Sequence, residues 1–167
     1  MTSRERDDLL ATLAHHRTLL RHTANGLTDE QAATRSTVSE LCVGGVIKHV
    51  TRMERRWTDF LERGPVAFGS FDAEAYAAHA ASFRMEPGET LEGLLAEYAE
   101  TAAHTDDVVA GLSDLNADGP LPVTPWWPEG TRWTARRVLL HVIAETAQHA
   151  GHADIVREAI DGQKTMG

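Results

Sequence analysis

Four side chains that could bind a metal ion lie close together near the end of the sequence. They are His141, Glu145, His149 and His152, in the stretch TARRVLLHVIAETAQHAGHADIVREAI from Thr134 to Ile160. On a helix, at about 100° per residue, they project within an arc of about 80°. Imidazole and carboxylate groups are costly to bury without partners. The stretch therefore predicts either a metal ion or a buried hydrogen-bond network on this face.

A metal site on this face needs a ligand from elsewhere. Glu145 and His149, four residues apart, can hold an ion from the same side, but two ligands make a weak site. His49 lies in another apolar stretch and would complete a set of two histidines and one carboxylate. Such sets hold catalytic zinc and also non-haem iron. His141 and His152 are then expected to be hydrogen-bonded neighbours of the ligands, or alternatives to them.

The competing interpretation is structural. A histidine on an apolar helix face is more commonly a hydrogen-bonded core residue than a ligand, and nine histidines make chance pairings easy. The histidines outside these two stretches, His79 among them, are expected on the surface or at helix flanks, and no role is assigned to them.

The elements that must position these residues are helices. Apolar residues recur at helical spacing in four long stretches: Arg4–Thr23, Val43–Glu62, Glu89–Leu112 and Thr134–Ile160. Thr134 is a typical N-cap, and Gly162 follows the last apolar residue as a typical stop. Four long helices of this kind predict an all-α four-helix bundle.

The connections are expected to be long crossovers. Thr28 to Gln31 has the form of a capping box and predicts a short helical turn. Residues 72–83 are also expected to be helical. Ser113 to Trp133 contains four prolines and is interpreted as a long ordered loop, and strand-like alternation is absent throughout. The expected organisation is one four-helix-bundle domain over residues 1–167.

Charge and composition exclude several classes of partner. The net charge is −9, and no cluster of basic residues is longer than two. This argues against nucleic acids and anionic membranes. No apolar run reaches membrane-spanning length, and the charged N-terminus has no signal-peptide core, so a cytoplasmic location is expected. Cys42 is the one cysteine, and we expect it to be a small buried residue rather than a nucleophile.

Two further expectations concern surfaces. The loop before the last helix carries Trp126, Trp127 and Trp133. These residues would either wall a substrate pocket or cover the end of the bundle or a dimer contact. The apolar stripes are wider than one core seam needs, which favours a homodimer with two-fold symmetry.

The motifs resemble those of a known family. The segment VGGVIKH from Val43 to His49, followed by Glu54 and Trp57, and the segment ETAQHAGHAD from Glu145 to Asp154 are similar to the DinB-like superfamily. The similarity is closest to the actinobacterial DinB-family or mini-circle-protein subgroup. It implies a four-helix bundle, commonly dimeric, that holds a divalent metal ion with three residues.

The resemblance also implies the ligand set. The broad family pattern has three histidines, whereas this sequence has Glu145 at the middle position, which is similar to mycothiol-dependent maleylpyruvate isomerase. By that similarity His49, Glu145 and His149 are the ligands. The isomerase has an additional C-terminal domain with no counterpart after the last helix here. We therefore expect transfer of a thiol rather than isomerisation.

Family members with assigned activity use mycothiol, bacillithiol or glutathione. Of the 16 basic residues 14 are arginine, which is typical of a GC-rich actinobacterium, where mycothiol would be the thiol. The predicted function is therefore a metal-dependent thiol S-transferase that conjugates mycothiol to a small electrophile. Zinc is the expected ion, with nickel, manganese or iron as alternatives.

Three other functions use the same three ligands. The first is a metal-binding stress or binding protein without turnover. The second is a metal-dependent hydrolase in which bound hydroxide is the nucleophile. The third is a non-haem iron oxygenase, which would consume oxygen.

Overall fold

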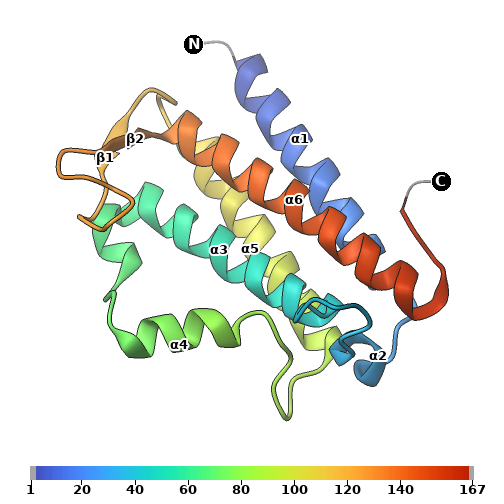
Figure 1. Ribbon diagram of the computed structural model, residues 1–167. Helices are drawn as coiled ribbons and strands as arrows, with labels where there is room; N and C mark the ends of the chain where they lie inside the picture. The colour runs from blue at the N-terminus through green and yellow to red at the C-terminus, as the bar shows by residue number, and fades with distance from the viewer. Residues whose placement is uncertain (1–2, 166–167) are drawn as a thin grey trace.

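Four long helices form the frame of the molecule. The computed structural model describes residues 3–165. Its long helices lie side by side (Figure 1): α1 (Ser3–His22), α3 (Val43–Arg63), α5 (Leu91–Gly111) and α6 (Ala135–Asp161). α6 packs on α1 and on α3, and α3 also packs on α5. The predicted four-helix bundle is confirmed, and each predicted helix end lies within two residues of the observed one.

The helix ends follow from local chemistry. The Thr134 side chain accepts a hydrogen bond from the Arg137 N–H at the start of α6, and Gly162 ends that helix with a left-handed φ of 78°. The predicted capping box of Thr28 and Gln31 opens α2 (Asp29–Ala33). None of the helices in the described part of the chain is long and apolar enough to cross a membrane.

The crossover from α3 to α5 lies outside the bundle. It contains the 3-10 helix η1 (Gly64–Phe68) and the short helix α4 (Ala73–Ala81), which runs beside α3 (Figure 1). α4 has no buried residue. The chain adopts a positive φ on either side of it, at Gly69 and at Gly88. The helix predicted over residues 72–83 is therefore present but shorter.

The crossover from α5 to α6 contains a small hairpin that was not expected from the sequence. β1 (Asp118–Pro120) pairs antiparallel with β2 (Arg132–Thr134), with Gly119 opposite Trp133. The expectation that strands are absent was therefore wrong. Three residues are too few to show the period-two alternation by which strands are recognised. Of the predicted long loop, residues 113–117 precede β1 and residues 121–131 lie between the two strands.

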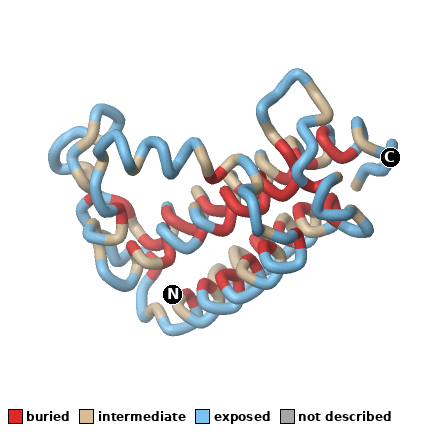
Figure 2. The backbone as a smooth tube through the Cα atoms, turned by 90° about the horizontal axis from the view of Figure 1, so that it is seen from below, coloured by how far each residue is buried: buried red, intermediate tan, exposed pale blue. Residues whose placement is uncertain are grey.

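Buried residues gather on the inner faces of the long helices (Figure 2). One end of the core is mainly aliphatic and includes Val46, Ile47 and Leu94. The other end is aromatic and is formed by Trp57, Phe60, Phe68 and Trp133 together with aliphatic residues of α1 and α6. The core thus changes along α3 from aliphatic to aromatic packing.

A buried ion pair crosses the middle of the bundle. The Arg17 guanidinium of α1 binds the Glu54 carboxylate of α3, and the two side chains are 2% and 0% exposed. The same guanidinium lies 2.8 Å from the Asp106 carboxylate of α5. Three of the four long helices are therefore joined by one charged group in the interior.

Candidate metal centre

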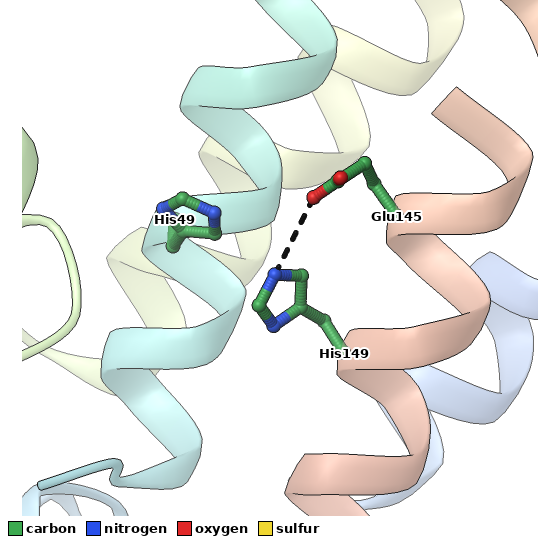
Figure 3. Close-up of side chains that lie close together, drawn as sticks. All are labelled: His49, Glu145 and His149. Carbon is green, nitrogen blue, oxygen red and sulfur yellow. Dashed lines mark ion pairs between the residues drawn. The ribbon is translucent and has the colours of Figure 1, made fainter. Parts of the chain in front are cut away.

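The structure brings His49, Glu145 and His149 together (Figure 3). His49 comes from α3 and the other two from adjacent turns of α6. One ligand atom of each lies within 4.8 Å of the others. The Glu145 Oε2 and His149 Nε2 atoms are 3.6 Å apart. Ligand atoms on a tetrahedral zinc ion would be about 3.4 Å apart, so small side-chain rotations would bring all three onto one ion.

A second group with suitable atoms is a weaker candidate. Asp59, Glu62 and His104 also lie within 4.8 Å of one another. Two of them are exposed, Asp59 is paired with Arg63, and Glu62 contacts His104. Ion pairs on an exposed helix surface account for this group without a metal ion.

The protonation states of the first group suit a metal ion. His49 is 7% exposed, and burial lowers its pKa to about 3, an effect strengthened by His149 and His79 nearby. At neutral pH its imidazole is therefore uncharged. The neighbouring His149 side chain is the main cause that lowers the pKa of the Glu145 carboxyl below its usual value. The group thus includes a neutral imidazole and a carboxylate, the protonation states that a divalent cation requires.

A serine fixes which nitrogen of His49 is free. The Ser82 hydroxyl donates to the His79 carbonyl oxygen at 2.6 Å, and the Ser82 oxygen also lies 3.0 Å from His49 Nδ1. Because the only hydroxyl proton is used, Nδ1–H must be the donor of the second bond. Nε2 of His49 then has its lone pair available. Figure 3 shows one ring nitrogen of His49 turned toward Glu145 and His149.

The segment that carries Ser82 is held against α3 at close range. The Phe83 ring stacks on the His49 ring, with centroids 3.9 Å apart. A Cβ atom added to Gly45 would lie 2.0 Å from the Phe83 carbonyl oxygen, so a glycine is needed for this approach. The Lys48 ammonium lies 2.6 Å from the Glu89 carboxylate and 3.3 Å from the Arg84 carbonyl oxygen. Residues beyond the four long helices therefore orient His49.

The three side chains lie at the wall of a cavity of about 620 Å³. Its other walls come from α3, α4, η1 and the loop before α6. They are mainly aromatic and include Trp57, Phe68, Phe71, Trp126 and Trp127. A cavity of this size, in which aromatic walls lie beside a group of converging ligand atoms, is typical of small-molecule binding.

Comparisons with known proteins identify the family and the fold. The sequence matches the model of the MST family, described as mycothiol-S-transferase, over residues 8–162. The chain belongs to the mycothiol-S-transferase family. No curated protein matches. A solved structure, described as the conserved protein of a locus from Enterococcus faecalis, has 17% sequence identity and a TM-score of 0.71. The match covers 98% of this chain and 99% of that one, and it shows that the two chains share a fold.

The three tryptophans that were expected to wall a pocket or cover the bundle end lie in two different places in this family member. Trp126 and Trp127 line the cavity. Trp133 does not line it, because its ring is 9% exposed and stacks on Trp57 with centroids 4.6 Å apart. Trp133 therefore belongs to the core behind the cavity wall.

The remaining histidines of the predicted face lie around the three central residues. His141 lines the cavity and contacts the Trp57 ring, with centroids 4.9 Å apart, and burial lowers its pKa. The Nδ1 atoms of His152 and His149 are 3.5 Å apart. His79 is exposed, as expected, but its ring lies 5.4 Å from that of His49 and it lines the cavity. Its place beside the site had no signal in the sequence.

The neutral, buried His49 should make the metal-free protein sensitive to mild acid. Its folded-state pKa of about 3 lies below the value of about 6.5 expected in the unfolded chain. Between these values the unfolded state binds the extra proton, so stability falls as the pH decreases. We expect chelated protein to unfold at a lower urea concentration at about pH 5 than at about pH 7.

A variant separates this effect from that of other groups. His49→Gln keeps a neutral donor toward Ser82 but cannot be protonated, so its urea midpoint should fall less over the same range. His141 also has a lowered pKa and contributes in the same direction in both proteins. Equal falls in the two proteins would show that His49 is not the responsible group.

Proposed function

We propose that this chain is a metal-dependent mycothiol S-transferase that joins the thiol to a small electrophile. His49, Glu145 and His149 would hold the divalent ion, with zinc the first candidate. One observation carries the proposal. In a chain of the mycothiol-S-transferase family, ligand atoms from two helices converge at the wall of an aromatic cavity.

The three residues have complementary tasks. His49 would present Nε2, with its ring held by Ser82 and Phe83. The Glu145 carboxylate would supply negative charge, and His149 would bind from the next turn of α6. A bound divalent ion would lower the pKa of a coordinated thiol, so that thiolate is available at neutral pH. Three protein ligands leave a position open for substrate, as in catalytic rather than structural zinc sites.

The cavity wall would position the electrophile. Trp126, Trp127 and Phe68 bound an apolar space in which an electrophilic carbon can lie near the thiol and away from bulk water. In the transfer the sulfur–carbon bond forms, the leaving group departs with its electron pair, and the thiol proton passes to solvent. A separate general base is not required once the thiol is ionised.

The test is conjugation of mycothiol to 1-chloro-2,4-dinitrobenzene by the zinc-loaded protein. We expect product to form faster than in the uncatalysed reaction and to depend less on pH near neutrality. A free thiol with a pKa of about 8.5 is mostly protonated there, whereas a metal-bound one is ionised. Chelation should return the rate to the uncatalysed value while leaving the far-ultraviolet circular dichroism spectrum largely unchanged.

Cys42→Ser is the matched control. The Cys42 sulfur is 1% exposed and accepts the Gly45 N–H at the start of α3, a task that serine performs well. The variant should therefore keep its activity. An inactive Cys42 variant together with active chelated protein would mean covalent catalysis through cysteine. Absence of any reaction with mycothiol, bacillithiol or glutathione would favour a metal-binding protein without turnover.

A further inference from the structure

The arginines of α3 differ according to the side of the helix on which they lie. Arg55 and Arg63 face away from the cavity, and each is paired with a carboxylate, Glu97 at 2.9 Å and Asp59 at 2.7 Å. Arg52 and Arg56 line the cavity. Within residues 3–165 neither has a carboxylate at ion-pair distance.

The two cavity arginines are free to bind a ligand. Arg52 makes one long hydrogen bond, 3.5 Å to the Ala78 carbonyl oxygen of α4. Arg56 makes no hydrogen bond or ion pair in the described part of the chain. Both side chains are exposed. A guanidinium group offers five donors in a planar fork that fits a carboxylate or a phosphate.

The charge of the cavity is opposite to that of the whole chain. The net charge of the protein is −9, yet Glu145 is the one carboxylate among the residues that line the cavity. That carboxylate faces His149 and belongs to the proposed ligand set. Two guanidinium groups and, when bound, a divalent cation leave the cavity positive. An anionic molecule is therefore favoured over an uncharged one.

The spacing along α3 sets the size of that molecule. Arg52 and Arg56 follow His49 by three and seven residues, which corresponds to about 4.5 Å and about 10.5 Å along the helix axis. The aromatic side chains Phe71 and Trp127 line the same cavity. A planar apolar group between an anionic end at the arginines and a reactive end at His49 would match this arrangement.

We propose that the electrophile taken by this cavity carries a carboxylate or phosphate group, which Arg52 and Arg56 bind while its reactive carbon faces the three proposed ligands. The identification of the bound anion as the electrophile rests on the proposed transferase function. The anion site itself can be tested without turnover. Arg56 is the principal contact, because Arg52 also holds α4.

The first experiment measures binding alone. Naphthalene-2-sulfonate, a poor zinc ligand, and the uncharged naphthalene-2-carboxamide are titrated calorimetrically into the zinc-loaded full chain. We expect the sulfonate to bind about tenfold more tightly, as charge-assisted hydrogen bonds at a partly exposed site allow. Added salt should reduce this difference. Equal affinity for the two compounds would overturn the proposal.

Single variants locate the anion site. Arg56→Gln should abolish most of the preference for the sulfonate, and Arg52→Gln should reduce it. Arg55→Gln is the matched control, since Arg55 lies on the same helix but is paired with Glu97 outside the cavity. It should leave the preference unchanged. A preference that survives Arg56→Gln, or that Arg55→Gln removes equally, would overturn the proposal.

The second experiment assigns the anion to the electrophile rather than to the thiol. Mycothiol is held constant, and 4-(bromomethyl)benzoate is compared with its methyl ester, each relative to its uncatalysed rate. A sulfur–carbon bond forms, bromide leaves with the electron pair, and the thiol proton passes to buffer. We expect about tenfold greater acceleration for the acid, and Arg56→Gln should remove it. If Arg56→Gln raised only the KM for mycothiol, the assignment of the anion to the electrophile would be overturned.

The two proposals can fail separately. If no thiol reacts but the sulfonate preference depends on Arg56, the anion site stands and the transferase function does not. If mycothiol is conjugated but acid and ester react alike and the sulfonate shows no preference, the transferase function stands and the anion site does not.

Discussion

Replacing any one of His49, Glu145 and His149 by alanine should abolish stoichiometric metal binding and, with it, thiol transfer. A site with three protein ligands does not tolerate the loss of one, because neither remaining pair can satisfy a divalent ion. The measurement is the metal content per chain of protein purified without a metal-binding tag, by plasma mass spectrometry. The protein without substitutions should contain close to one divalent metal ion per chain, and zinc should be the main metal.

His152→Ala is the appropriate comparison. His152 lies beside His149 but outside the group of three, so its loss should weaken binding less. Because the bundle has an extensive core of its own, all four variants should keep their helical spectra. Full metal content in the His49 variant would contradict the ligand set and would transfer its place to His141, His152 or His79.

The second large effect concerns stability. Glu54→Leu should lower the free energy of unfolding by about 3–5 kcal/mol, because it leaves the Arg17 charge buried without its main partner. Asp106 is half exposed and remains as a weaker partner. Urea denaturation of the metal-free proteins measures the difference.

Two further variants test the cause. Glu97→Ala removes a similar pair, Arg55–Glu97, at the surface, where both side chains are more than 40% exposed. It should cost less than about 1 kcal/mol. Arg17→Met combined with Glu54→Leu should recover much of the loss, since no buried charge remains. A double variant as unstable as Glu54→Leu alone would show that lost packing, not an unpaired charge, is responsible.

Much of this arrangement was accessible from the sequence. The apolar spacing located the four long helices, and the spacing of Glu145 and His149 placed both on one face of α6. His49 could be proposed because it lies within an apolar stretch of a facing helix. These features depend on the 3.6-residue period of the helix, which a sequence shows directly.

The parts that were missed depend on contacts between distant segments. Ser82 orients His49, but its position follows from the close approach of its segment to Gly45 and Lys48, 34 or more residues earlier in the chain. In the sequence Trp133 could not be distinguished from Trp126 and Trp127. In the structure it lies in the hairpin and is buried in the core. Local patterns do not encode such long-range choices.

The crossover that forms the outer wall of the cavity has a consequence for how the protein can change over time. α4 contributes no buried residue, so substitutions along it cost the bundle little stability. The four long helices, by contrast, supply both the core and the three central residues. A lineage could therefore exchange the wall facing the substrate, and with it the range of molecules accepted, while the frame and its ion site stay as they are. In such a protein, divergence in specificity would begin at residues 69–81.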